Sequence, residues 1–168
     1  AAEITECVNR TDISVAVSKA AGSYSDGATG HDGFYLGGVV GSIMAANSSE
    51  IVNKITANSN FGNISATLAT SAVGTQSVKV GGICGNTRGP IVLINNENKA
   101  ESVTLENSQA DYILCAAGGI VGEYGDPWTH ENSTPAQLQG NVNRAYVLSK
   151  TNAQECPAGG IIGYVFDP

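Results

Sequence analysis

The chain has 168 residues, and its 15 acidic residues outnumber its 8 lysines and arginines to give a net charge of −7 at pH 7. This balance argues against nucleic acid and anionic membrane surfaces as partners, because both attract basic proteins. Charged residues make up 14% of the chain and hydrophobic residues 42%, which argues against charge-rich disorder and a helical bundle. No apolar stretch is long enough to insert into a membrane, and the length suits a single domain over residues 1–168.

The first predicted element is an asparagine turn near the start of the chain. An apolar residue, Ile4, is followed by Asn9 and then by Ile13. From Ile13 to Val17 the residues alternate in the way that is typical of a half-buried strand. The same frame of an apolar residue, an asparagine and an apolar or small residue recurs along the chain. The later copies are Ile55, Asn60 and Ile64, then Ile91, Asn96 and Ala100, then Leu138, Asn143 and Val147.

A glycine-rich pentapeptide follows each asparagine turn. The sequence Gly-Gly-x-x-Gly, with two apolar residues inside, occurs four times at intervals of about 40 residues. The copies occupy residues 37–41, 81–85, 118–122 and 159–163. Glycine there permits a positive φ or a close approach of backbones at a tight corner, where a Cβ atom would clash. This structural role is predicted for Gly38, Gly82, Gly119 and Gly160.

The repeats predict an all-β fold, a parallel β-helix-like solenoid of about four repeats of about 40 residues each. Stacked coils place equivalent residues about 4.8 Å apart. Asparagines can therefore hydrogen-bond to their copies in the coils above and below and form a ladder. The predicted ladder contains Asn9, Asn60, Asn96 and Asn143. No stretch has the periodicity of an amphipathic helix.

The pattern Ile-x-x-Cys-x-Asn from Ile4 to Asn9, together with Gly-Gly-Ile-Val-Gly at residues 118–122, resembles the GLUG-motif repeat family. Repeats of this family are common in large surface proteins of gut Bacteroides-type bacteria and in streptococcal proteases that cleave immunoglobulin A. The resemblance covers essentially the whole chain. It implies a parallel β-helix-like solenoid in a secreted or cell-surface protein, of which residues 1–168 are a segment. It implies no catalytic residue, because the family motif is structural.

The four cysteines show no C-x-x-C spacing, which argues against a zinc ribbon or a thioredoxin-like motif. Cys115 and Cys156 each lie three residues before a Gly-Gly pair, where Phe34 and Val78 stand in the other repeats. Apolar residues at equivalent positions predict an inward-facing column. Two interpretations stay open. The thiols are buried, free and packed as small hydrophobic groups, or Cys115 and Cys156 form a disulfide between adjacent coils.

Two insertions interrupt the repeats. The second, from Glu123 to Gln137, contains the predicted ligand-binding residues Tyr124, Asp126, Trp128 and His130. Aromatic ring faces stack on pyranose C–H groups and acids accept hydrogen bonds from sugar hydroxyls, so this combination fits a glycan site. The alternative is that Trp128, the single tryptophan of the chain, covers one end or flank of the solenoid.

The candidate metal-binding residues are few. In the first insertion, from Ala21 to Tyr35, Asp26 and Asp32 allow a calcium site, but an ordinary solvated turn is the better interpretation. His130 and Glu131 begin the metalloprotease motif H-E-x-x-H, yet a threonine occupies the second histidine position. We therefore predict no metal, no cofactor and no catalytic residue.

The sequence predicts a non-catalytic repeat module displayed on a bacterial surface, which acts in adhesion or binds a glycan or a host surface protein. A carbohydrate-active β-helix enzyme, either a lyase or a hydrolase, is the first alternative. It needs two acids about 5 to 10 Å apart in a groove, and no column of acids recurs through the repeats. An ice- or surface-binding protein is the second alternative. It needs regular rows of threonines, and the threonines here do not fall in register.

Overall fold

The computed structural model describes residues 1–17, 33–44, 52–68, 77–110, 114–125, 136–153 and 155–166. All regular elements in these ranges are β-strands, and none of these residues forms a helix that could cross a membrane. The chain passes through five short strands, and the next five stack on them in parallel. The predicted all-β, parallel β-helix-like solenoid is therefore confirmed, and the described strands form a stack of four coils.

Each coil contributes one strand to each of five sheets, which we number 1 to 5 in chain order. Coil 1 contains β1 (Glu3–Thr5), β2 (Val8–Asn9), β3 (Ile13–Val17), β4 (Gly33–Gly37) and β5 (Val40–Met44). Coil 2 contains β6 (Asn53–Thr56), β7 (Ser59–Asn60), β8 (Ile64–Leu68), β9 (Ser77–Gly81) and β10 (Cys84–Arg88). Coil 3 contains β11 (Ile91–Ile94), β12 (Glu97–Asn98), β13 (Ser102–Ala110), β14 (Leu114–Gly118) and β15 (Val121–Gly125). Coil 4 contains β16 (Gln137–Gln139), β17 (Val142–Asn143), β18 (Tyr146–Asn152), β19 (Ala158–Gly159) and β20 (Ile162–Phe166).

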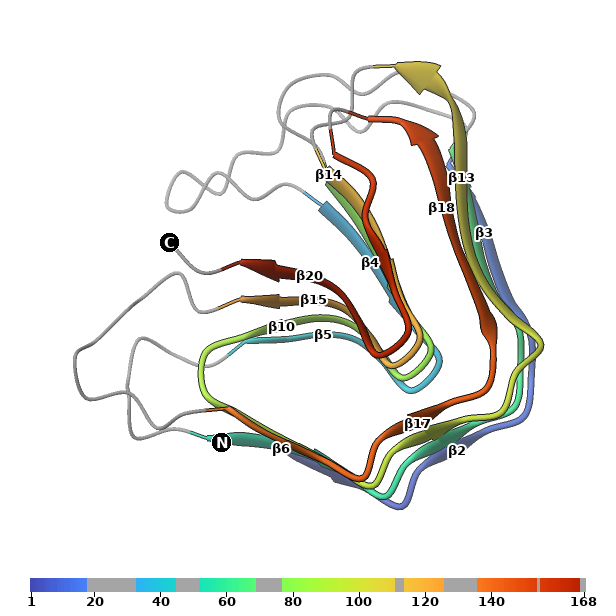
Figure 1. Cartoon of the computed structure of the whole chain (residues 1–168). Coiled ribbons are helices and arrows are strands. Elements are labelled where there is room, and N and C mark those ends of the chain that lie inside the picture. Colours follow the sequence, from blue (N-terminus) through green and yellow to red (C-terminus); the bar gives the residue numbers. More distant parts are fainter. Residues whose placement is uncertain are drawn as a thin grey trace.

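Figure 1 looks along the stack and shows how the five sheets are arranged. Sheets 1, 2 and 3 form a bent outer wall. Sheets 4 and 5 fold back into the interior as an arch, whose tip is the glycine block and points at sheet 2 (Figure 1). The arch divides the interior, so the apolar side chains form two separate clusters.

The first core cluster fills the space between sheets 3 and 4. It consists of the buried residues Ile64, Ala66, Leu68, Val78, Val80, Val103, Leu105, Cys115 and Ala117. The second cluster fills the space between sheets 5 and 1 together with the arch tip. It consists of Ile43, Ile55, Ile83, Cys84, Ile91, Leu93, Ile120 and Val121. The alternation that predicted half-buried strands places Ile64, Ala66 and Leu68 of β8 in the first cluster, and Ile13 of β3 packs against it. Val15 of β3 is exposed.

The glycine blocks stand in register, and in coil 3 each glycine is required by a different backbone neighbour. A Cβ atom on Gly118 would overlap the carbonyl oxygen of Val121 in the same corner. A Cβ atom on Gly119 would overlap the carbonyl oxygen of Gly160 in the next coil. A Cβ atom on Gly122 would lie 2.8 Å from the backbone nitrogen of Val80 on the facing strand. Close approach, rather than a positive φ, therefore explains the motif.

Asparagine side chains form a ladder along sheet 2 at the arch tip. Asn9 Nδ2 donates to Asn60 Oδ1, Asn60 Nδ2 to Asn98 Oδ1, and Asn98 Nδ2 to Asn143 Oδ1, over 2.8, 2.9 and 3.1 Å. The prediction was right for Asn9, Asn60 and Asn143 and wrong for Asn96, whose place Asn98 takes. Asn98 also donates to the carbonyl oxygen of Gly119, so the ladder holds the glycine corner in place.

Asn96 belongs to a second ladder one corner earlier. Asn58 Nδ2 donates to Asn96 Oδ1, and Asn96 Nδ2 donates to Asn141 Oδ1, both at 2.9 Å. In coil 1 the equivalent residue is Cys7, whose backbone N–H donates to Asn58 Oδ1. The sequence signal for this ladder is the triplet Asn-x-Asn, which occurs in coils 2, 3 and 4 and begins with cysteine in coil 1.

A column of left-handed residues marks the corner between sheets 1 and 2. Glu6, Ala57, Asn95 and Gly140 follow register-matched strand ends and have φ values of 55°, 56°, 56° and 64°. Asparagine and glycine adopt this conformation readily, whereas glutamate and alanine do so at a cost. The corner geometry is therefore imposed by the stack in coils 1 and 2 rather than by the local sequence.

Candidate functional site

The predicted ligand-binding residues lie at the end of β15 and beyond it. The structure describes Tyr124, while Asp126, Trp128 and His130 lie outside the described residues. The half-buried side chain of Tyr124 packs against the second core cluster, at the register position of Thr87 in coil 2. The site at Tyr124, Asp126, Trp128 and His130 stays a prediction.

Both predicted insertions are shorter than their predicted bounds. In the second, residues 123–125 complete β15 and Gln137 begins β16, so the insertion spans at most residues 126–136. In the first, residues 33–35 belong to β4 and pair with β9. Asp26 and Asp32, the alternative calcium ligands, lie outside the described residues.

The connection from sheet 5 to sheet 1 differs in length between coils. Met44 of coil 1, Arg88 of coil 2 and Gly125 of coil 3 share one register position at the end of sheet 5. Coil 2 then reaches sheet 1 through Gly89 and Pro90 alone. Coils 1 and 3 use residues 45–52 and 126–136 for the same step. At the edge where sheet 5 is joined to sheet 1, the short turn of coil 2 therefore stands between the longer connections of coils 1 and 3.

A buried ion pair spans the inside of the arch. Lys79 on β9 and Glu123 on β15 approach to 2.5 Å between Nζ and Oε2, with side chains 2% and 7% exposed. The ring centroid of Tyr164 on β20 lies 5.5 Å from the same Nζ. Burial lowers the pKa of Lys79, and the carboxylate of Glu123 opposes that effect. Sequence reasoning missed this pair, because no motif distinguishes these two residues from solvent-facing charges.

The register position of Glu123 is polar in every coil. Ser42, Asn86 and Tyr164 occupy it in coils 1, 2 and 4. Asn86 is fully buried, and its Nδ2 donates a long hydrogen bond of 3.4 Å to Ser42 Oγ. Its Oδ1 has no hydrogen-bond partner. A buried acceptor without a hydrogen-bond partner lowers the stability of the folded protein. The presence of Asn86 at this buried position therefore calls for an explanation.

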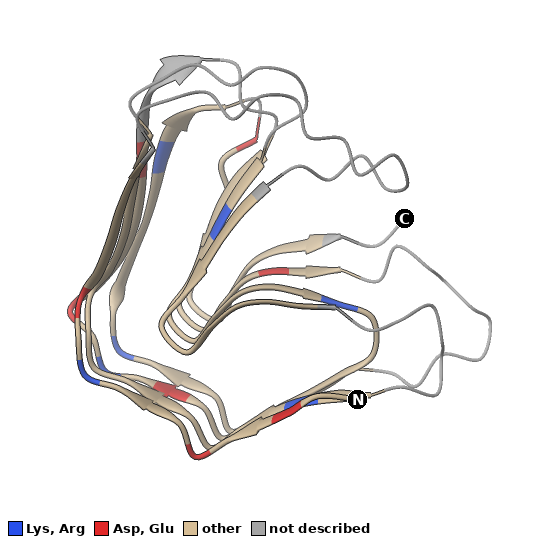
Figure 2. Ribbon diagram, turned by 180° about the vertical axis from the view of Figure 1, so that it is seen from behind, with Lys and Arg blue, Asp and Glu red and all other residues tan. Residues whose placement is uncertain are grey.

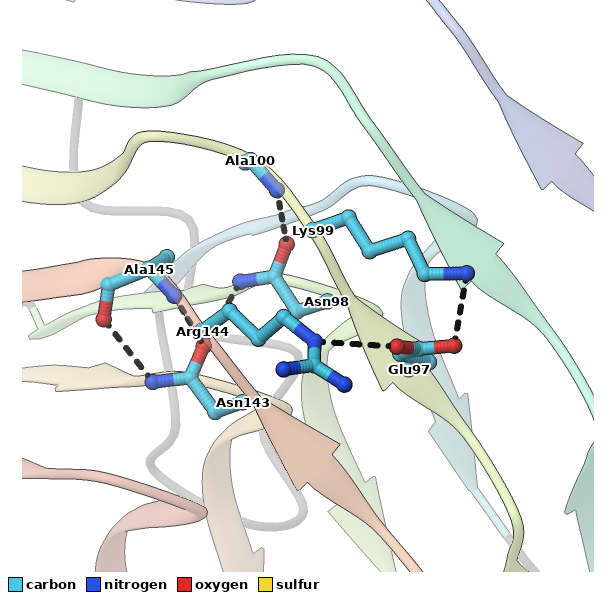
Figure 3. A network of polar contacts seen from close by, with 7 residues as sticks. All are labelled: Glu97, Asn98, Lys99, Ala100, Asn143, Arg144 and Ala145. Atoms are coloured by element: carbon cyan, nitrogen blue, oxygen red, sulfur yellow. Dashed lines mark hydrogen bonds and ion pairs between the residues drawn. The ribbon is translucent and has the colours of Figure 1, made fainter.

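A row of exposed side chains follows the outer face of sheet 2. It comprises Arg10, Phe61, Lys99 and Arg144, one from each coil, directly after the ladder asparagines. The Phe61 ring contacts two cations, with its centroid 5.0 Å from Arg10 Cζ and 5.2 Å from Lys99 Nζ. Glu97 accepts hydrogen bonds from Lys99 Nζ at 2.7 Å and Arg144 Nε at 3.1 Å (Figure 3). These bonds, that from Lys99 first, lower the pKa of Glu97.

This row has residue types that suit a ligand surface, but its groups contact one another. Most charged positions lie on the outer wall of the solenoid, as Figure 2 shows. Exposed ion pairs and cation–π contacts contribute little to stability, because water and salt screen them. Because the cations already contact the Phe61 ring and the carboxylate of Glu97, we assign the row to holding neighbouring coils together.

The cysteines are free thiols, so the alternative of a Cys115–Cys156 disulfide is wrong, while the predicted burial is right for Cys115 and wrong for Cys156. The predicted column is in register, with Phe34, Val78 and Cys115 paired across sheet 4 and Cys156 next in line. Cys115 is buried, whereas Cys156 is exposed in coil 4, the last coil of the described stack.

We expect a thiol reagent to label two cysteines quickly and two slowly in the native protein at pH 8. Cys7 and Cys156 are exposed, whereas burial raises the pKa of Cys84 to about 12 and that of Cys115 to about 11. Only the thiolate reacts, so the buried pair should react only as the protein unfolds. Absorbance with Ellman's reagent, with a denatured sample as the four-thiol reference, measures this. Four fast thiols would contradict the burial of Cys84 and Cys115.

No group of three or more histidine, cysteine, aspartate or glutamate side chains that could hold a metal ion occurs among the described residues. Comparison with protein families, with curated proteins and with solved structures found no match to this chain.

Proposed function

We propose that this chain is a non-catalytic β-solenoid module of a secreted or cell-surface bacterial protein, and that it binds a glycan through loops on one edge of the stack. The resemblance to GLUG-motif repeats supports the cellular setting. One observation carries the proposal. The connections formed by residues 45–52 and 126–136 begin and end at the same edge of the stack as the Gly89–Pro90 turn.

Insertions at one register position of a solenoid gather on one face, and that face is commonly the binding face. The asparagine ladders and glycine corners make the solenoid scaffold stiff, so the insertions can vary in length and sequence without loss of the fold. The coil 3 insertion carries Asp126, Trp128 and His130, which combine an aromatic surface with polar groups. That combination suits a sugar better than a flat protein surface, because ring faces stack on C–H groups and acids bind hydroxyls.

Binding on a broad glycan array tests the proposal, with Trp128→Ala as the site variant. We expect the wild type to bind a defined set of glycans and Trp128→Ala to lose about five- to thirtyfold in apparent affinity, since one stacked ring contributes about 1 to 2 kcal/mol. Tyr146→Ala is the matched control, because Tyr146 is an exposed aromatic residue on β18 in a different sheet.

A second variant tests the edge as a whole. Replacing residues 126–135 by Gly-Pro copies the coil 2 connection, in which Gly89 and Pro90 join Arg88 to Ile91. We expect this variant to fold and to bind no glycan. Silence of the wild type across the array, or equal binding by the shortened variant, would contradict a glycan site on this edge.

A further inference from the structure

Three buried polar residues lie on the facing sheets 4 and 5 of the arch, without an evident structural need. Lys79 comes from β9, Asn86 from β10 and Glu123 from β15, and all three are buried. An ion pair in such a place rarely improves stability over apolar residues of the same size. Apolar residues would therefore stabilise the arch at least as well as these three groups. Their burial points to a chemical role.

Glu123 neighbours both other residues, Lys79 through an ion pair and Asn86 through the strand register. Lys79 Nζ lies 2.5 Å from Glu123 Oε2, and Asn86 stands in register with Glu123 on the adjacent strand, about 4.8 Å away along the stack. Gly122 permits close approach of sheet 5 to Val80, the residue after Lys79. The lysine stem is long and flexible, so a change of rotamer can carry Nζ from the carboxylate toward the Asn86 amide.

We propose that Lys79 and Asn86 join in an intramolecular isopeptide bond, with Glu123 as the proton carrier. Glu123 first takes a proton from the Lys79 ammonium, and the neutral Nζ attacks Asn86 Cγ. The protonated carboxyl of Glu123 donates a hydrogen bond to Asn86 Oδ1, the acceptor that lacks a partner. The Nζ–Cγ bond forms and the Cγ–Nδ2 bond breaks. Glu123 passes the proton from Nζ to Nδ2, which leaves as ammonia, and no oxidant or reductant is needed.

Two further observations fit this reaction. Burial lowers the pKa of Lys79, which favours the neutral, nucleophilic amine over the ammonium. The Asn86 amide is held by Ser42 through Nδ2 only, which leaves the carbonyl free to be polarised. The product replaces a buried ammonium by a neutral amide and thereby removes a desolvation cost. The bond links β9 to β10 across the arch tip and closes the glycine corner covalently.

Intact-mass spectrometry of the full, freshly purified chain tests the proposal. We expect the mass to be lower than that of the sequence by one ammonia molecule. Trypsin normally cuts after Lys79 and releases residues 55–79 and 80–88. An acylated lysine is not cut, so the linked protein should yield one peptide spanning residues 55–88 that lacks one ammonia. An unchanged mass would overturn the proposal.

Loss of ammonia can also arise from succinimide formation at an asparagine, and the digest separates the two. A succinimide at Asn86 leaves Lys79 open to trypsin and places the mass change in residues 80–88, which would overturn the proposal. Glu123→Gln keeps the shape of the side chain but cannot take up and release a proton, so we expect the folded variant to show the full sequence mass. Lys79→Met is the matched control that also shows the full mass. A linked Glu123→Gln protein would overturn the role given to Glu123.

Discussion

Gly119→Ala is expected to lower the free energy of unfolding by about 3 kcal/mol. A Cβ atom at this position would overlap the carbonyl oxygen of Gly160 and the side chain of Asn143. Both belong to the next coil. The added methyl group therefore forces coils 3 and 4 apart at the arch tip and disrupts the contacts between them. Chemical denaturation followed by far-ultraviolet circular dichroism measures the loss. The larger Gly119→Val should prevent soluble expression.

Gly160→Ala is the matched control. Gly160 holds the same position of the motif in coil 4, yet nothing lies within 4 Å of the Cβ atom that it would gain. We therefore expect the free energy of unfolding to change by about 0.5 kcal/mol or less. Equal destabilisation by Gly119→Ala and Gly160→Ala would show that the glycines serve local chain conformation. In that case, contact between neighbouring coils would not explain the motif.

The glycine blocks made the fold class predictable from the sequence. Four copies of one corner at near-constant spacing require four similar coils, and similar coils stack in register. The register of Phe34, Val78 and Cys115 followed from the same spacing and is confirmed. The sequence could not decide between a positive φ and close approach at Gly119, because that choice depends on where the next coil lies.

The asparagine ladder was predicted only in part, because the frame in coil 3 began at the wrong apolar residue. Leu93 is the register partner of Ile55, and Asn98 follows Leu93 at the same spacing as Asn60 follows Ile55. Counting from Ile91 selected Asn96, which lies in the neighbouring ladder. Aligning the Asn-x-Asn triplets would have placed both ladders correctly.

The polar cluster in the arch could not be predicted from local sequence. Lys79 alternates with Val78 and Val80, a pattern typical of a strand with one face in solvent. It is buried because the glycine corner turns sheet 5 back over that face and brings Glu123 of the next coil against it. Residues 44 positions apart in the sequence meet only when the stack is known, and no pairwise motif encodes that.

Asn98→Ala is expected to lower the free energy of unfolding by about 3 kcal/mol. Asn98 is fully buried, donates to Asn143 Oδ1 and the Gly119 carbonyl, and accepts from Asn60 Nδ2 and the Ala100 N–H. Alanine removes all four hydrogen bonds at once and leaves buried polar groups in two neighbouring coils without this partner. Each such group costs about 1 to 3 kcal/mol, and part of the loss is recovered by relaxation. Urea denaturation of the variant and the wild type gives the difference.

Asn9→Ala removes the same residue type from the same ladder at its exposed end. Asn9 is half-buried in coil 1 and bonds to Asn60 Oδ1 and to the backbone of Thr11, groups that water reaches in the variant. We expect a loss of about 1 kcal/mol or less, because solvated groups keep their hydrogen bonds. The contrast between Asn98→Ala and Asn9→Ala therefore separates burial from residue identity. If both variants unfold at the wild-type urea concentration, the ladder contributes nothing to stability, and the two core clusters alone hold the coils in register.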